Sequence, residues 1–204
     1  MTFGTVDTDP NLLIRIRKGD EQAFLELYRK RQGAIYRFAL HMSGSAQSAE
    51  DVTQEVFLAL LREDCGFDPA RGTLSGYLFG IARKIVLRQI ERSRSDVPLE
   101  GEIEESFSPE LAVKDDVLAR LTHLEGIEAL RRAVVTLPRR YREVVVLCDL
   151  EEVDYADAAT ILGCPIGTVR SRLHRARGLL LDKLNQERHS RAPAAPLTPA
   201  RCAI

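Results

Sequence analysis

The sequence has 204 residues, of which 45% are hydrophobic, 29% are charged and 6% are aromatic, with no tryptophan and a formal net charge of −1. This length allows one or two small domains, and the composition favours small helical modules over a thick sandwich. No apolar run approaches the roughly 18 residues that cross a bilayer, and residues 1–10 lack the regions of a signal peptide, so we expect a cytoplasmic protein with no membrane insertion.

Helical periodicity runs through the first 95 residues, and no window shows sustained period-two alternation. A first helix carries Leu12, Leu13 and Ile16 and is broken at Gly19-Asp20. A second helix continues to a break at residues 43–45, Ser-Gly-Ser. The apolar residues that share its buried face are Phe24, Leu27, Tyr28, Ile35, Phe38, Ala39 and Met42.

A third helix is expected to be capped around Ser48 and to have an apolar inner side. Its inner residues are Val52, Val56, Phe57, Leu60 and Leu61. Its outer side has four residues at i, i+3, i+4 and i+7, which form one ridge. This acidic ridge consists of Asp51, Gln54, Glu55 and Leu58. The ridge is either a solvated helix face or a docking surface, and the spacing alone leaves both interpretations open.

A fourth helix follows a loop over residues 66–72 and has an apolar side and a basic side. The apolar side contains Leu74, Tyr77, Leu78, Ile81, Ala82 and Ile85. The other side is a basic strip made of Arg83, Lys84, Arg88, Arg92 and Arg94. Cations beside Phe67 and Tyr77 suit single-stranded nucleic acid, although a solvated face with both aromatics in the core is the simpler alternative. Gly72, Gly76 and Gly80 indicate either a close approach of another backbone or a bend.

The middle of the chain is strongly acidic, because residues 96–130 carry 10 acidic and 2 basic side chains. Pro98, Gly101 and Pro109 lie in the same stretch, and this composition resists compact folding. The composition predicts a flexible linker over residues 96–124 between modules at 10–95 and 125–187. The proline-rich and alanine-rich end, residues 188–204, is expected to be a disordered tail.

The second module begins with a helical stripe of Leu130, Ala133, Val134 and Leu137, after which Pro138 opens another helix. That helix has Tyr141, Val144, Val145 and Cys148 inside, although residues 144–146, Val-Val-Val, also suit a strand. A helix-turn-helix pattern comes next. It consists of a helix over residues 155–162, a turn at Gly163-Cys164-Pro165 and a helix from Ile166 to about Leu184.

The last helix has a buried side and a basic outer side. Val169, Leu173, Ala176 and Leu180 hold it against the module. The residues pointing away near its start form a recognition face, which consists of Arg170, Ser171, His174 and Arg175. In a helix-turn-helix such a face enters the major groove, where arginine grips guanine. Arg172, Arg177 and Lys183 flank it and suit phosphates.

The sequence gives little support for an enzyme, a cofactor or a metal site. It contains no P-loop, GxGxxG or HExxH motif, and its four histidines are scattered. Cys65, Cys148, Cys164 and Cys202 are far apart and form no CxxC pair, so neither a zinc site nor a disulfide framework is indicated.

Four stretches together resemble the extracytoplasmic-function, or group four, sigma factors of bacterial RNA polymerase. Residues 49–58, AEDVTQEVFL, resemble the polymerase-binding motif of region two. Residues 78–84, LFGIARK, resemble the promoter-melting helix that follows it. Residues 137–144, LPRRYREV, and residues 163–177, GCPIGTVRSRLHRAR, resemble region four. The resemblance covers roughly residues 10–186 and implies an all-α fold of two small domains, region two and region four, without a region three domain between them.

The resemblance also implies partners and residue roles. The acidic ridge, Asp51, Gln54, Glu55 and Leu58, would bind the clamp coiled coil in the largest subunit of core RNA polymerase. Single-stranded minus-ten DNA would contact Phe67, Arg71, Tyr77, Arg83, Lys84 and Arg88. Duplex minus-thirty-five DNA would contact Thr168, Arg170, Ser171, Arg172, His174, Arg175 and Arg177. An anti-sigma factor is a further expected partner, and no cofactor or catalytic residue is implied.

Two other interpretations remain at this point. A helix-turn-helix regulator that does not engage core polymerase would use the second module alone and would leave the first without a role. A sigma-like decoy that only sequesters a regulator would tolerate loss of the DNA-reading arginines, and Arg170 and Arg175 are both present.

Overall fold

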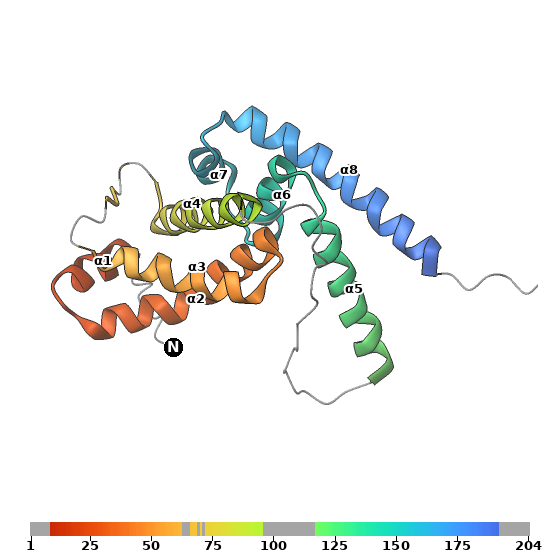
Figure 1. Cartoon of the computed structure of the whole chain (residues 1–204). Coiled ribbons are helices and arrows are strands. Elements are labelled where there is room, and N and C mark those ends of the chain that lie inside the picture. Colours follow the sequence, from red (N-terminus) through yellow and green to blue (C-terminus); the bar gives the residue numbers. More distant parts are fainter. Residues whose placement is uncertain (1–8, 63–65, 69, 71, 96–116, 192–204) are drawn as a thin grey trace, which may run out of the picture.

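The computed structural model describes residues 9–62, 66–68, 70, 72–95 and 117–191, and every regular element in these ranges is helical. The prediction of an all-α fold is confirmed. The elements are α1 (Asp9–Arg17), α2 (Glu21–Ser43), α3 (Ala46–Leu60), α4 (Leu74–Ser95), α5 (Val117–Val135), α6 (Arg139–Val145), the π-helical turn η2 (Val146–Leu150), α7 (Tyr155–Leu162) and α8 (Ile166–Arg191). We refer to α1–α4 as the first module and to α5–α8 as the second module (Figure 1).

Glycines and short polar side chains end and start the helices of the first module where the sequence predicts. Gly19 has φ +83°, and Asp20 then caps α2 by accepting a hydrogen bond from the Ala23 amide at 3.1 Å. That bond lowers the pKa of the Asp20 carboxyl, and a bond from the Arg15 guanidinium adds to the effect. At the other end of α2, Gly44 has φ +76° and donates to the Leu40 carbonyl at 2.8 Å. These turns separate α1, α2 and α3 and let them fold back on one another.

Two details of α3 differ from the expectation. The N-cap is Ser45 and not Ser48, because the Ser45 hydroxyl accepts a hydrogen bond from the Ser48 amide at 3.3 Å. The cap therefore lies three residues earlier, directly after the Gly44 turn. Leu61 is 50% exposed and not on the inner side, since the helix ends at Leu60. The other inner residues of α3, from Val52 to Leu60, are buried as predicted.

The second module differs from the expectation at both ends. Helix α5 begins at Val117, so the last part of the stretch expected to be linker, 96–124, is helical. Residues 96–116 lie outside the described residues, and so does the part of the predicted tail from residue 192 onwards. Helix α8 continues to Arg191, beyond the predicted end near Leu184. The three valines at 144–146 are helical, which excludes the strand alternative.

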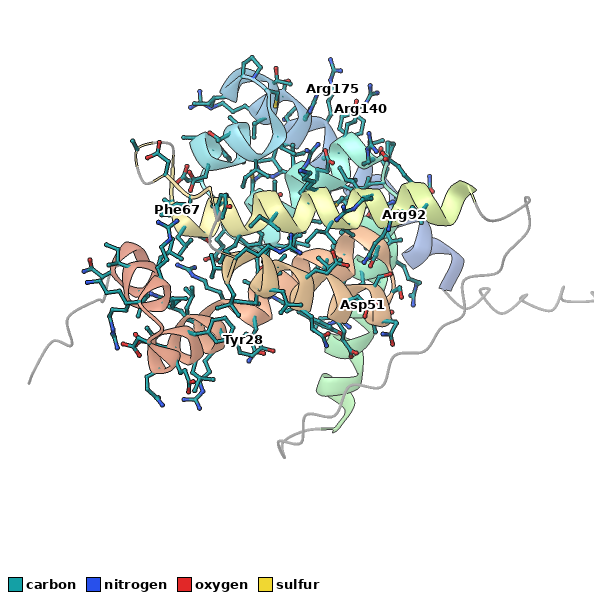
Figure 2. The ribbon with its side chains drawn as sticks, turned by 60° about the vertical axis from the view of Figure 1, so that its left-hand side comes forward. Tyr28, Asp51, Phe67, Arg92, Arg140 and Arg175 are labelled. Carbon is teal, nitrogen blue, oxygen red and sulfur yellow. The ribbon has the colours of Figure 1, made fainter. Side chains whose placement is uncertain are left out.

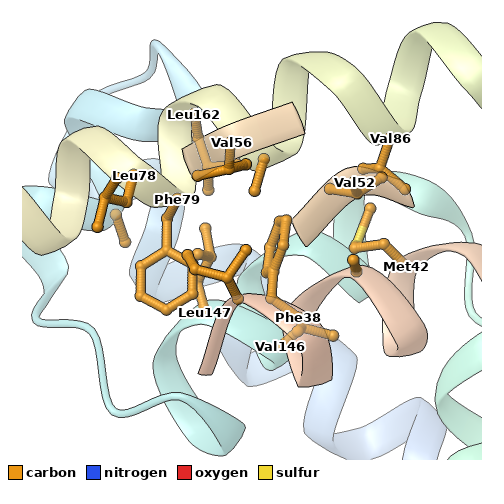
Figure 3. Close-up of a cluster of buried hydrophobic side chains, with 14 of the residues drawn as sticks. Phe38, Met42, Val52, Val56, Leu78, Phe79, Val86, Val146, Leu147 and Leu162 are labelled. Atoms are coloured by element: carbon orange, nitrogen blue, oxygen red, sulfur yellow. The ribbon is translucent and has the colours of Figure 1, made fainter. Parts of the chain in front are cut away.

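The two modules pack on each other around α4. Figure 1 shows α4 with α2 and α3 on one side and with α6 and α7 on the other. The buried side chains form one continuous cluster, in which Phe38 and Phe79 of the first module meet Val146, Leu147 and Leu162 of the second (Figure 3). The rings of Phe38 and Phe79 lie edge to face with their centroids 5.5 Å apart. The face of α4 opposite α2 and α3 is therefore partly covered by the second module.

Candidate functional site

The acidic ridge stands out from α3 into solvent. Asp51, Gln54 and Glu55 are exposed, and Leu58 is 59% exposed. The ridge is held in this orientation because Val52, Val56 and Phe57, on the opposite side of α3, are buried against the module. Gln47 donates a hydrogen bond to the Asp51 carboxylate at 3.2 Å. An exposed leucine surrounded by acidic and amide side chains can pack against an apolar residue of a partner while its neighbours pair with basic ones.

Aromatic side chains stiffen the surface next to the ridge. Gln54 borders a shallow hollow between α2 and α3 that is also lined by Tyr28 and Tyr36. The Tyr28 ring packs against Phe57 with a centroid distance of 4.8 Å, and Phe24 packs against Phe57 at 6.2 Å. The ridge and this hollow thus belong to one rigid surface of two helices, which Figure 2 shows around Tyr28 and Asp51.

The aromatic pair expected near minus-ten DNA lies together at the start of α4. The rings of Phe67 and Tyr77 are tilted with their centroids 5.5 Å apart, and both side chains are half-buried against the core. Each ring therefore packs inward and keeps some exposed surface. Arg71, the basic residue predicted beside them, lies outside the described residues.

The basic strip on α4 divides into paired and open cations. Arg83 donates to the Glu143 carboxylate of α6 at 3.2 Å, and Arg88 lies 3.7 Å from the Glu55 carboxylate of the acidic ridge. Lys84 and Arg92 are exposed. Helical phase placed these four residues on one side of α4, and the structure shows that a neighbouring module covers part of that side.

Local signals build the helix-turn-helix of the second module. Asp154 caps α7 by accepting hydrogen bonds from the Ala156 and Asp157 amides at 3.0 and 3.1 Å. Gly163 ends α7 with φ +63°, a left-handed conformation in which glycine pays no steric penalty. The Pro165 carbonyl then accepts from the Thr168 amide at 2.8 Å as α8 begins. The predicted turn and the bounds of α7 are confirmed.

The recognition face is open to solvent along the start of α8. Arg170, Ser171, His174 and Arg175 are exposed, while Val169, Leu173 and Ala176 are buried. Ser171 donates a hydrogen bond to the Thr168 carbonyl at 3.1 Å, and Thr168 is half-buried. The Arg170 guanidinium lies 5.9 Å from the centroid of Tyr155, which orients it toward α7. The side chains of the recognition face are therefore accessible from solvent.

The two other arginines expected at DNA have partners within the protein. Arg177 pairs with the Asp149 carboxylate through two hydrogen bonds of 2.6 and 3.0 Å, which raises the pKa of Arg177. Arg172 is half-buried, and its guanidinium lies 4.0 Å from the Cys164 sulfur. These contacts brace α8 against η2 and against the turn that precedes it.

Two residues that sequence reasoning missed extend the recognition face onto α6. The Arg140 guanidinium lies over the Tyr141 ring at 4.7 Å from its centroid, and Figure 2 shows Arg140 close to Arg175. A hydrogen bond from Arg175 lowers the pKa of the Tyr141 hydroxyl. Tyr141 thereby orients Arg175. The sequence signal was the pair Arg139-Arg140 directly after Pro138, which places two cations at the exposed start of a helix.

The surfaces face different directions. In Figure 2, Tyr28 and Asp51 lie on one side of α4, and Arg140 and Arg175 lie on the other. Among the described residues no three His, Cys, Asp or Glu side chains come together as a metal site would require. No helix in the described part of the chain has both the length and the apolar character needed to span a membrane.

Both modules match known families. Residues 27–95 match the family described as Sigma-70 region 2, and residues 127–180 match Sigma-70, region 4. The region 2 match includes the acidic ridge and the basic strip, and the region 4 match includes the helix-turn-helix. A regulator built on the second module alone does not account for the first of these matches.

Relatives from distant bacteria share most of this chain. It is 35% identical over 182 residues to the RNA polymerase sigma-H factor of Pseudomonas aeruginosa, covering 85% of this chain and 92% of that protein. It is 30% identical over 175 residues to the ECF RNA polymerase sigma factor SigW of Bacillus subtilis, covering 83% and 93%. It is 34% identical over 171 residues to the ECF RNA polymerase sigma factor SigE of Mycolicibacterium smegmatis, and the match covers 83% of this chain and 65% of that longer protein.

Solved structures share the arrangement of helices. CnrH in complex with the cytosolic domain of CnrY has a TM-score of 0.65 and 23% identity, and the match covers 88% of this chain and 98% of that one. The sigma factor RpoE of Bartonella quintana in complex with the anti-sigma factor NepR has a TM-score of 0.63 and 27% identity, covering 79% and 96%.

Proposed function

Because this chain belongs to the extracytoplasmic-function sigma factors of bacterial RNA polymerase, we propose that three of its surfaces divide the work of promoter recognition. The chain is a transcription initiation factor and not an enzyme. It directs core polymerase to promoters, and its place of action is therefore the cytoplasm. We propose which residues bind core polymerase, the minus-ten DNA and the minus-thirty-five DNA.

The acidic ridge binds the clamp coiled coil in the largest polymerase subunit. The observation that supports this assignment is the exposure of the ridge on α3, which leaves an apolar side chain and its polar neighbours accessible to a partner. Leu58 supplies the apolar contact, and Asp51, Gln54 and Glu55 supply the polar ones. Contacts of this kind, with an apolar anchor inside a polar rim, dominate many interfaces.

The start of α4 holds the melted minus-ten strand. Phe67 and Tyr77 offer aromatic surface to unstacked bases, while Arg83, Lys84 and Arg88, with Arg71, attract phosphates. The recognition face reads the minus-thirty-five duplex in the major groove, with Arg175 gripping a base and Thr168 lying beside the backbone. Arg172 and Arg177 contribute by fixing α8, and each keeps exposed surface that a phosphate can approach.

An anti-sigma factor that covers the same surfaces is the proposed regulator. The support is the similarity to the Bartonella quintana sigma factor, which is described in complex with the anti-sigma factor NepR. A protein that binds the acidic ridge would exclude core polymerase by direct competition.

The decisive experiment is transcription by purified core polymerase on sheared DNA of the source organism, with and without this protein, followed by mapping of transcript 5′ ends. We expect discrete protein-dependent starts that share two upstream motifs. Leu58→Ala should weaken binding to core polymerase by about tenfold, because an anchor at the centre of an interface is lost. Leu181→Ala is the matched control, since Leu181 is 61% exposed and lies on α8. Equal affinities of the two variants for core polymerase would contradict the role of the ridge.

A further inference from the structure

Two tyrosines of the second module each lie between two arginines. Tyr141 of α6 is 8% exposed and belongs to the buried cluster. The Arg140 guanidinium lies 4.7 Å from the centroid of its ring, and its hydroxyl accepts a hydrogen bond from Arg175 of α8. Figure 2 shows Arg140 and Arg175 close together. The ring and the hydroxyl of one side chain thus hold two cations that come from different helices.

Tyr155, the first residue of α7, lies between two other arginines. The Arg170 guanidinium lies 5.9 Å from the centroid of its ring. The Tyr155 hydroxyl accepts a hydrogen bond from Arg177, which is itself held by two hydrogen bonds to Asp149. Tyr155 is 37% exposed, so its ring forms part of the surface on which Arg170 lies.

The two tyrosines restrict the arginines that would read base pairs. Reading a base pair requires that a guanidinium enter the groove in one orientation. An exposed arginine samples many rotamers, and fixing them on binding costs free energy, part of which is removed when a partner holds the side chain beforehand. Arg170 and Arg175 are exposed on the recognition face, and each has a tyrosine beside it. The conformations of these two arginines therefore depend on α6 and α7 as well as on α8.

We propose that Tyr141 and Tyr155 are positioning residues that set the base preference of the recognition face, Tyr141 through its hydroxyl and Tyr155 through its ring. The inference rests on the proposed minus-thirty-five role of that face. A hydrogen bond from Arg175 to the Tyr141 hydroxyl has a direction, and it fixes where the guanidinium points. Tyr155 supports Arg170 with the face of its ring, which phenylalanine would also supply. The same substitution, tyrosine to phenylalanine, should therefore have different effects at the two positions.

The probe is a library of DNA duplexes in which about ten adjacent base pairs, one helical turn, are randomised. The full-length protein is mixed with the library, and bound and free duplexes are separated and sequenced. Discrimination at each position is the ratio of the affinity for the preferred base pair to the affinity for its alternatives. Arg175→Ala and Arg170→Ala identify the positions that the two arginines read, because discrimination is lost there.

Tyr141→Phe removes one hydroxyl and keeps the ring beside Arg140. We expect discrimination at the position read by Arg175 to fall by about fivefold, since a hydrogen bond that holds this arginine is lost. The double variant Tyr141→Phe/Arg175→Ala should discriminate no worse than Arg175→Ala, because the hydroxyl acts through that arginine. A merely structural role would instead lower the melting temperature and weaken binding to all duplexes alike. That result, or unchanged discrimination, would overturn the role of Tyr141.

Tyr155→Leu removes a ring and should lower discrimination at the position read by Arg170 by about two- to fivefold, since the contact between cation and ring is lost. Tyr155→Phe supplies the ring again and should restore most of this discrimination. Unchanged discrimination in Tyr155→Leu, or an equal loss in both variants, would contradict the role of the ring. If Arg170→Ala weakens binding equally on all sequences, Arg170 contacts a phosphate, and the assignment of Tyr155 to base preference is wrong.

The wild-type protein separates failure of this inference from failure of the proposed function. If wild type selects a motif and the tyrosine variants discriminate as well as wild type, the inference is refuted and the minus-thirty-five role of the recognition face stands. If wild type selects no motif, either alone or bound to core polymerase, the recognition face does not read base pairs, and both proposals are refuted. Protein-dependent transcript starts would in that case still show recruitment of polymerase.

Discussion

The basic side of α4 meets the other module, and the recognition face of α8 does not. On α4 of the first module, Arg83 is paired with Glu143 of the second module, whereas on α8 the recognition face projects into solvent. Both sets were predicted from helical phase alone. Phase determines which side of a helix a residue occupies within its own module, and it does not determine whether another module covers that side.

The largest expected effect tests whether the two modules are one folding unit. Phe79→Ala removes a ring that is 3% exposed and packs on Phe38 beside Val146 and Leu147 of the second module (Figure 3). The cavity should lower the free energy of unfolding by about 3–5 kcal/mol. Urea denaturation followed by circular dichroism gives this value. If the modules are independent, the transition of the second module will keep its midpoint.

The next prediction contrasts two arginines of α8 that sequence reasoning placed together. Arg175→Ala should cost about 1–3 kcal/mol of binding to a matched minus-thirty-five duplex and should relax preference at one base pair. Arg177→Ala should leave the preference unchanged and lower the melting temperature slightly, because it removes the paired hydrogen bonds to Asp149. Equal loss by Arg175→Ala on matched and scrambled duplexes would instead assign Arg175 to a phosphate.

The contrast between these arginines shows what the sequence could predict. The starts, ends and buried faces of the helices follow from nearby residues, such as Asp20, Gly44 and Gly163, and most of these expectations agree with the structure. The partners of Arg83 and Arg177 lie 60 and 28 residues away and follow from tertiary packing. No periodicity in a single sequence specifies such contacts.

The small errors in the predicted positions of single residues also arise from tertiary packing. Ser45 and Ser48 are both good caps, and the choice between them depends on where the Gly44 turn leaves the chain. Phe79 was not assigned to the inner side of its helix, yet it packs on Phe38 of the first module and beside Val146 and Leu147 of the second (Figure 3). The shared core was therefore the part of the fold that the sequence could not supply.

A pH titration tests the contact between the two modules at His41, where α2 of the first module meets Arg131 of α5 in the second. Burial, with Arg131 and Arg37 nearby, lowers the pKa of His41 to about 4. The unfolded chain takes up this proton near pH 6.5, so the neutral histidine's contribution is complete above that pH and is lost as the pH falls toward 4. At pH 5 the loss is about 2 kcal/mol.

The measurement is the difference in unfolding free energy between wild type and His41→Gln from pH 8 to pH 5. The difference is needed because burial raises the pKa of Glu151, which stabilises the fold as the pH falls and opposes the histidine effect. Taking the difference cancels the contribution of Glu151. Parallel pH curves for the two proteins would show that His41 does not carry the acid sensitivity.

The smallest effect distinguishes two glycines of α4. Alanine favours a helix over glycine by up to about 1 kcal/mol, so Gly80→Ala, with nothing within 4 Å of the new Cβ, should raise the free energy of unfolding. Gly76→Ala should gain less or lose stability, since its Cβ meets the Asp157 carboxyl carbon at 3.2 Å.

A double-mutant cycle assigns the difference between the two glycines to the contact between modules. In an Asp157→Ala background the two alanine substitutions should become similar, because the crowding carboxylate is gone. A deficit that persists at Gly76 in this background would come from the first turn of α4 itself, where Thr73 also lies 3.3 Å from the new Cβ. The contact of Asp157 with α4 would then not affect the stability of this helix. The covering of the basic strip of α4 would in that case depend on the ion pairs between the modules and on their shared core.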